Sequence, residues 1–240
     1  MSTLKGDLLI AGQDLFTSSS VSETNLGVMA TTGDGRYFRY VLVGGTTLVP
    51  GQLYQASAEV TGWENLACAA AVAGATTIVT TSTLTATLNQ MAGGLLTVTA
   101  STGAGYTYKI KGNTAAAGAV CTITLEDPLL TNIALTTSTV DIIANPYSGV
   151  VLCNSTISST PLGVAVYPIV NGQYGWLQVK GITSVLADGA IAVGTNVVAS
   201  NGTSGSVEAG ADATDLQAFV GTAVTGISTT EYGFINLRLV

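Results

Sequence analysis

A chain of 240 residues with seven basic side chains, fourteen acidic ones and no histidine lacks the chemistry of several protein classes. Seven basic residues in total, in a chain with a net charge of −7, do not provide the clustered lysine and arginine surface that binds DNA or RNA. Charged residues form only 9% of the chain and the mean hydropathy is +0.50, so we expect much uncharged surface to be buried in an assembly. The alternative is a monomer coated with Thr, Ser, Asn and Gly.

The first region, residues 1–35, is rich in Ser, Thr and Gly and shows weak periodicity. We expect an extended N-terminal arm here rather than a core element, with a disordered terminus as the alternative. Its opening, "MSTLKGDLLIAGQDLF", has one lysine and a broken apolar run, which is not typical of a secretory signal. The most apolar window, residues 66–79, is too short to cross a bilayer as a helix, so no membrane partner is expected.

The second region, residues 36–149, carries the densest strand signals. In "TYKIKG", Tyr108 and Ile110 alternate with polar residues, and "CTITLED" alternates in the same way. A period of two predicts strands with one buried and one wet face. The alanine-rich stretch "GWENLACAAAVAG", residues 62–74, is the one place where a short helix is expected.

The third region, residues 150–240, holds a second set of short runs rich in Val, Ile and Thr, separated by turn signals. No strict repeat at a fixed period is visible, which argues against a solenoid. The sequence leaves open whether residues 36–149 and 150–240 form two domains or one interleaved sandwich. The fold class expected for the whole chain is all-β, with antiparallel sandwich or barrel units and an extended N-terminal arm. The clearest turn signals are Gly33-Asp34-Gly35, Asn113, Asp188-Gly189 and Asn201-Gly202.

Three cysteines, Cys68, Cys121 and Cys153, lie among small apolar residues without CxxC or CxxH spacing. This pattern favours buried free thiols that behave as small hydrophobic residues. It also favours production in a reducing cytoplasm.

Carboxylates are the remaining candidates for chemistry, because the lack of histidine excludes Ser-His-Asp and Cys-His catalysis and imidazole zinc sites. Glu126 and Asp127 are neighbours at a strand end, so their side chains point to opposite faces. The acids of residues 208–215 do not match the spacing of a calcium loop, and "GDGR" at residues 33–36 is no phosphate-binding loop. We therefore expect no enzymatic activity, no metal and no cofactor.

Aromatic residues are few, but two pairs flank a glycine: Tyr174 and Trp176, and Tyr232 and Phe234. In a strand, residues two apart share a face, and the glycine between them opens the other face to close backbone approach. Such pairs serve either as sugar-stacking platforms or as anchors in a core or a subunit interface. No acids and amides clearly converge on them, so we favour core or oligomer-interface anchors.

Several segments resemble tailed-phage head decoration, or capsid cement, proteins. They are "GRYFRYVLVGGTTLVPGQLYQA", "TYKIKG", "TLEDPL", "NPYSGVV", "PLGVAV", "YGWLQVKGITSVLADGAIAVGTNVV", "VGTAV" and "EYGFINLRL", in this order. The likeness covers most of the chain after about residue 30 and is strongest in the C-terminal part. Its motifs are structural and include no catalytic signature.

This resemblance implies a homotrimer of β-rich subunits on the outer surface of the phage capsid, made in the host cytoplasm. Its partners would be the major capsid protein and further copies of itself, and it would clamp the expanded shell. An arm at residues 2–30 would reach over a neighbouring capsid protein and add a strand to its sheet. Two alternatives belong to other classes: a surface adhesin that binds glycans through Tyr174 and Trp176, and another virion part such as a major capsid protein, a tail tube or a head fibre.

Overall fold

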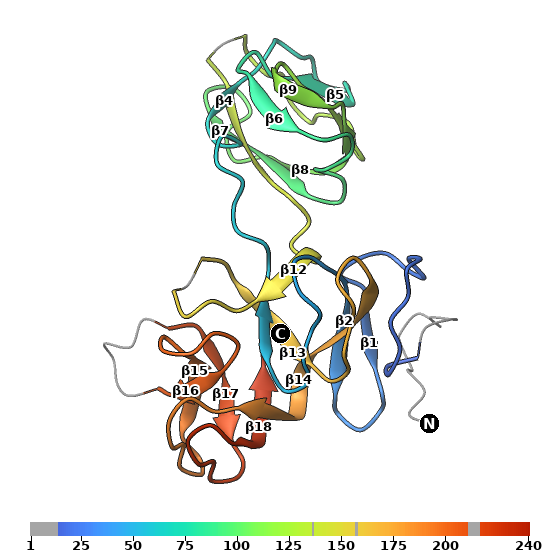
Figure 1. The fold of residues 1–240 in the computed structure, drawn as a ribbon. Helices are drawn as coiled ribbons and strands as arrows, with labels where there is room; N and C mark the ends of the chain where they lie inside the picture. Colours follow the sequence, from blue (N-terminus) through green and yellow to red (C-terminus); the bar gives the residue numbers. More distant parts are fainter. Residues whose placement is uncertain (1–13, 136, 157, 211–216) are drawn as a thin grey trace. The chain divides into compact units, whose positions relative to one another are not determined.

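The computed structural model describes residues 14–135, 137–156, 158–210 and 217–240, and it is all-β (Figure 1). No helix occurs among these residues, which confirms the fold class expected from the strand signals. Most strands are short and end at turns, as Val-, Ile- and Thr-rich runs between Gly, Asn and Asp predict. Their bounds are β1 Met29–Thr31, β2 Tyr37–Val43, β3 Leu53–Gln55, β4 Leu66–Ala67, β5 Thr77–Val79, β6 Leu84–Ala86, β7 Leu95–Ala100, β8 Thr107–Asn113, β9 Ala116–Ala119, β10 Thr122–Leu125, β11 Thr139–Ile143, β12 Ser148–Leu152, β13 Pro161–Ala165, β14 Tyr174–Leu186, β15 Asn196–Ala199, β16 Val207–Ala209, β17 Phe219–Ala223 and β18 Tyr232–Arg238.

The chain divides into two compact units, and the second is inserted into the first. One unit comprises Met1–Ala58 and Tyr147–Val240, and the other is Glu59–Pro146. This division differs from the regions 1–35, 36–149 and 150–240 expected from the sequence. Strands β2 and β3 form backbone pairs with β12, β13 and β14, so the chain before residue 59 belongs with the C-terminal part.

The inserted unit is built around a six-stranded sheet of order β4-β11-β7-β8-β10-β5 and a two-stranded sheet β6-β9. Tyr108 and Ile110 of β8 are buried while Lys109 and Lys111 are exposed, and β10 alternates likewise. The period of two therefore predicted both faces of these strands correctly. The unit has its own apolar core, which includes Trp63, Ile78, Met91, Leu96, Ile110, Ile123 and Val140.

The short helix expected at residues 62–74 is not formed. Leu66–Ala67 is a strand that pairs with β11, and Cys68 and Ala71 make single bridges to Thr80 and Ile133. Asn65 has a φ of 50°, and its N–H donates to the Asp141 carboxylate at 2.6 Å. The alanine content gave a local helical preference, which the pairing of the sheet overrides.

The unit formed by Met1–Ala58 and Tyr147–Val240 holds two small barrels that share strand β14. In barrel A, strands β2, β12, β3, β13 and the first half of β14, residues 174–179, follow one another, and β14 pairs back to β2. In barrel B, the second half of β14, residues 181–186, is followed by β18, β17, β15 and β16. A parallel bridge between Ala187 and Val207 connects β16 back to the end of β14.

The two barrels repeat the same structure. Residues 162–178, "LGVAVYPIVNGQYGWLQ", and 220–236, "VGTAVTGISTTEYGFIN", align without a gap. Residues 41–57 align with residues 185–200, and the segment 41–57 contains one additional residue. We infer that the unit formed by Met1–Ala58 and Tyr147–Val240 contains an internal duplication, although no strict repeat is visible in the sequence at a fixed period. It was missed because the first copy is interrupted by the inserted unit, which hides any fixed period.

Backbone hydrogen bonds recur at corresponding places in the two copies. The N–H of Gly51 donates to the Ala165 carbonyl at 2.8 Å, and the N–H of Gly194 donates to the Ala223 carbonyl at 2.9 Å. Both barrels also carry a register shift at corresponding places, where β3 pairs with β13 and where β15 pairs with β17. Three further pairs of N–H···O bonds match, each given with the barrel A bond first and the barrel B bond second. They are Leu48 to Ile169 and Ile191 to Ile227; Val43 to Gln173 and Ala187 to Glu231; and Gly44 to Val150 and Asp188 to Val207.

The barrel interiors correspond residue by residue, and their side chains are aliphatic except for Tyr54, whose hydroxyl accepts a hydrogen bond from the N–H of Val49. Burial of these side chains from water supplies the main favourable free energy of each barrel. The interior of barrel A is Val41, Val43, Leu48, Tyr54, Val150, Ala165, Ile169 and Leu177. The corresponding residues of barrel B are Val185, Ala187, Ile191, Val197, Val207, Ala223, Ile227 and Ile235, which belong to one larger core.

Part of the N-terminal region packs against the first barrel. Residues 14–28 contain no strand, yet Leu15 is 1% exposed and packs with Trp176. β1 then pairs with β2, and Ala30 is buried. The expectation that residues 1–35 contribute no core element is therefore wrong for residues 14–31, and residues 1–13 of the expected arm lie outside the described residues.

The position of the insertion gives a testable prediction about folding. In barrel B, β15 and β16 are joined by a short loop, whereas the corresponding strands of barrel A, β3 and β12, are joined through residues 59–146. We expect replacement of residues 59–146 by a short Gly-Ser linker to leave the two barrels folded, because their strand pairs all lie in residues 14–58 and 147–240. Circular dichroism and a cooperative urea transition would show this; an unfolded product would contradict it.

Candidate binding faces

The four aromatic residues singled out in the sequence lie at corresponding places on the outside of the two barrels. Tyr174 and Trp176 belong to β14 in barrel A, and Tyr232 and Phe234 belong to β18 in barrel B. Trp176 lies opposite Tyr40 of β2, as Phe234 lies opposite Ser184 of β14. We call the first outer surface the A face and the second the B face. The A face is Phe38, Tyr40, Val166, Tyr174 and Trp176, and the B face is Ile182, Ser184, Val224, Tyr232 and Phe234.

The A face is covered by the chain that precedes β2. Phe38, Tyr40 and Trp176 are completely buried beneath Leu15 and Ala30. Within the face, the Tyr40 ring lies 5.0 Å from the Trp176 ring, centroid to centroid, and 5.9 Å from the Tyr174 ring. These aromatic residues therefore form a core, and the buried Trp176 presents no face on which a sugar can stack.

The B face is open. Ile182 is 46% exposed, Val224 44%, Tyr232 53% and Phe234 52%. Alternation along β14 and β18 places these side chains outside the barrel, while their neighbours Val185 and Ile235 fill the interior. The surface is a group of adjacent apolar side chains rather than scattered single ones, which is typical of an interaction site.

The glycine within each aromatic pair is packed by an isoleucine, which corrects the expected backbone approach. A Cβ on Gly175 would lie 2.6 Å from Cδ1 of Ile169, and one on Gly233 would lie 2.5 Å from Cγ1 of Ile227. Each isoleucine fills its barrel interior at the place where the glycine lacks a side chain. In both copies the isoleucine lies six residues before the glycine, and its packing inside the barrel is the reason why a larger residue does not fit at the glycine.

The Tyr232 ring extends across to barrel A. It lies so close to Gly51 that an added Cβ there would be 2.6 Å from Cε1 of the ring. Gly51 also has a φ of 79°, a conformation that favours glycine. The tyrosine therefore fixes one edge of the B face against the turn that precedes β3.

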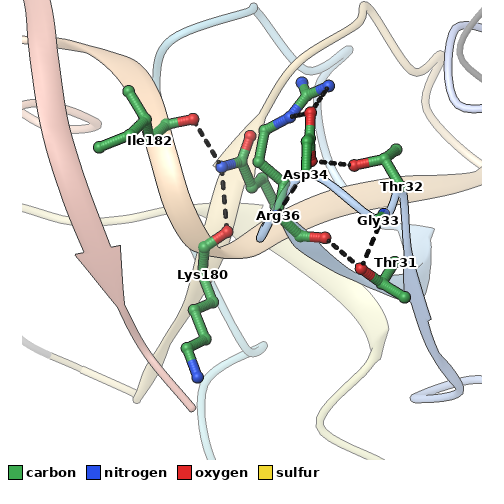
Figure 2. Close-up of polar contacts among 8 residues, drawn as sticks. Thr31, Thr32, Gly33, Asp34, Arg36, Lys180 and Ile182 are labelled. Carbon is green, nitrogen blue, oxygen red and sulfur yellow. Dashed lines mark hydrogen bonds and ion pairs between the residues drawn. The ribbon is translucent and has the colours of Figure 1, made fainter.

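Strand β14 crosses from barrel A to barrel B beside the β1–β2 turn (Figure 2). The buried amide of Gln178 donates to the carbonyls of Lys180 at 3.1 Å and Ile182 at 2.9 Å. Gly181 has a φ of 90°, and a Cβ there would lie 2.6 Å from the Gly35 carbonyl oxygen. The amide and the glycine together position the start of the B face.

The "GDGR" segment is this β1–β2 turn. The Thr32 hydroxyl donates to the Asp34 carboxylate, which also accepts from the Arg36 N–H at 3.1 Å and Nε at 2.8 Å (Figure 2). The Thr32 hydrogen bond, followed by those from Arg36, lowers the pKa of Asp34 to about 2. The carboxylate is used in the turn and in an exposed ion pair with Arg36, so the segment has a structural role.

The other acidic candidates do not converge. Glu126 forms an exposed ion pair with Lys109 at 3.3 Å. Glu208 lies in β16, and residues 211–216 of the acidic stretch lie outside the described residues. Within the described part of the chain, no three His, Cys, Asp or Glu side chains gather closely enough to hold a metal ion.

All three cysteines are buried and free, as the sequence predicted. Burial raises the pKa of Cys68 and of Cys153 to about 11. Both side chains therefore remain protonated in the folded protein near neutral pH and are weak nucleophiles.

Comparison with protein-family models, with curated proteins and with solved structures found no match to this chain. Among the described residues, no helix has the length and apolar character needed to cross a membrane.

The covered and open faces should respond differently to mutation. Trp176→Ala removes a fully buried side chain, and we expect it to lower the free energy of unfolding by about 3–5 kcal/mol. Phe234→Ala at the corresponding exposed place should change it by less than about 1 kcal/mol. Urea denaturation at high dilution measures both, and equal losses would contradict the assignment of a covered A face and an open B face.

The buried thiols predict a pH dependence. Because the folded pKa of Cys68 and Cys153 is about 11 and the reference value is 9.0, the folded state holds more protons between these values. The free energy of unfolding should thus fall as the pH rises from about 9 to about 11, and it should be unaffected by these groups below pH 9. Urea titrations across this range measure the slope. A double Cys68→Ala, Cys153→Ala variant should show a shallower slope; an unchanged slope would contradict the assignment.

Proposed function

We propose that this chain is a structural virion protein that binds the outside of a tailed-phage head as a homotrimer and stabilises the lattice of the major capsid protein. Two lines of support come from the sequence: the resemblance to capsid cement proteins, and the low charge of a chain without histidine. The open B face is the structural observation that carries the proposal, because exposed apolar side chains that lie side by side are typical of surfaces that protein contacts cover.

The barrels suit a role in which many weak contacts act together. A decoration protein binds at many positions on one shell, so several subunits held together gain avidity without a strong single contact. The strands of each barrel pair around a closed circuit, which leaves few exposed edges for uncontrolled association. The duplicated barrels and the inserted unit give one subunit several separate surfaces with which to bind neighbours.

The glycan-binding alternative loses its main support in the structure. It rested on Tyr174 and Trp176 as a stacking platform, and Trp176 is completely buried. Another virion part, such as a head fibre, remains the competing hypothesis. It differs in its assembled form, since a fibre subunit builds elongated particles rather than discrete trimers.

Reconstitution on phage heads tests the proposal. Purified protein is mixed with expanded heads that lack it, and pelleting with the heads and DNA retention on heating are measured. We expect saturable binding and retention of DNA to a higher temperature than in undecorated heads. Heads that have not expanded are the control. Absence of pelleting, or equal DNA loss with and without the protein, would contradict the proposal.

A further inference from the structure

The internal duplication gives the open B face a covered counterpart with which it can be compared. The two faces lie at corresponding places on barrels with the same pairing and the same interior. One is buried beneath a segment of the chain and the other is exposed. The covering of the A face is therefore a direct guide to the occupant of the B face.

The A face is covered by an extended segment through both backbone and side chains. Ser19 exchanges two backbone hydrogen bonds with Tyr174, at 3.0 and 2.8 Å. Tyr40 donates its N–H to Val28 at 3.1 Å, and its carbonyl accepts from Gly27 at 2.8 Å. Leu15 adds an apolar anchor that is 1% exposed. The occupant is thus an extended peptide that adds to the edge of the barrel, a recognised mode of peptide binding.

The B face has no equivalent segment within its own barrel. The covering segment of barrel A leads through β1 into β2. The strand that corresponds to β2 in barrel B is the second half of β14, and the chain before it is the first half of β14, already part of barrel A. Any segment that covers Ile182, Tyr232 and Phe234 would therefore have to come from outside this barrel.

The N-terminal residues repeat the sequence that anchors the A face. Asp14-Leu15-Phe16 places Leu15 in the A face and the Phe16 ring at 6.4 Å, centroid to centroid, from the Tyr167 ring. The same pattern occurs earlier as Asp7-Leu8-Leu9, followed by Ile10, within the residues that precede the described chain. Residues 1–13 thus contain an apolar tripeptide matched to a face of this kind.

We propose that residues 1–13 of a second copy of this chain bind the B face, with Leu8 and Leu9 against Phe234, Ile182 and Val224. The arm and the face are different surfaces, so the contact is heterologous, and heterologous contacts close into rings when the rotation permits. This inference rests on the proposed homotrimer and identifies the contact that joins its subunits. The ordering of a 13-residue segment costs conformational entropy, which burial of the face offsets.

A complementation experiment tests the exchange between copies. Deletion of residues 2–13 removes the arm and none of the described contacts. Phe234→Asp destroys the face at an exposed position. We expect the full chain to form an oligomer in size-exclusion chromatography with light scattering, and each variant alone to be monomeric. An equimolar mixture should form a one-to-one complex, because one variant supplies the arm and the other supplies the face.

Val193→Asp is the matched control, since Val193 is 67% exposed in the same barrel but lies outside the B face. This variant should assemble as the full chain does. An arm-deleted protein that still forms the oligomer, or a mixture of the two variants that stays monomeric, would overturn the proposal. The experiment uses no phage heads, so its failure alongside successful decoration of heads would leave the proposed function intact.

Disulfide trapping separates exchange between copies from binding within one chain. Leu9→Cys and Phe234→Cys are made in separate chains and mixed under mild oxidation. The three native cysteines are buried, so the new thiols are the accessible ones. A disulfide-linked dimer of the two variants supports the proposal. A chain that carries both changes and closes only an internal disulfide would overturn it, because the arm would then cover its own B face.

Discussion

The backbone pairing of strand β14 is the interaction on which the unit with the two barrels depends. Its first half pairs with β2 and β13 in barrel A, and its second half pairs with β18 in barrel B. The two barrels therefore share one continuous strand, and the turn between them is fixed by Gly181 and the buried amide of Gln178. Loss of this pairing would open both barrels, so their stabilities are coupled.

Duplication followed by divergence explains why two equal barrels carry unequal surfaces. Their interiors are hydrophobic at every corresponding position, although the residue types differ at several of them, because a close-packed barrel interior must be filled by side chains of suitable volume. Their outer faces are under no such constraint. Tyr40 and Trp176 became core residues beneath the N-terminal segment, whereas Ser184 and Phe234 remain on a surface that a partner can reach. The residues that the two copies share are thus those that the barrel fold requires, and the residues that differ on the outer faces are those available for binding.

The sequence predicted the fold class and the alternation of β8 and β10, because both follow from local periodicity. It also identified the Tyr-Gly-aromatic pairs, yet it did not distinguish the buried Trp176 from the exposed Phe234. That distinction depends on Leu15 and Ala30, which are distant in sequence and carry no periodic signal. The sequence did not identify Ile182 and Val224 as part of a binding face, for a similar reason. The face to which they belong becomes visible only when the two copies of the duplication are aligned, with Ile169 and Gly175 matched to Ile227 and Gly233. The insertion of residues 59–146 was not predicted either, since its boundaries have no compositional marker.

We propose that this chain acts through surfaces that bind further copies and a capsid lattice. Cryo-electron microscopy of the assembled particle tests it most directly. The account predicts threefold density for this chain on the outside of the head, with an extended segment of a neighbouring copy over Tyr232 and Phe234. A particle without this chain on its exterior would contradict the account.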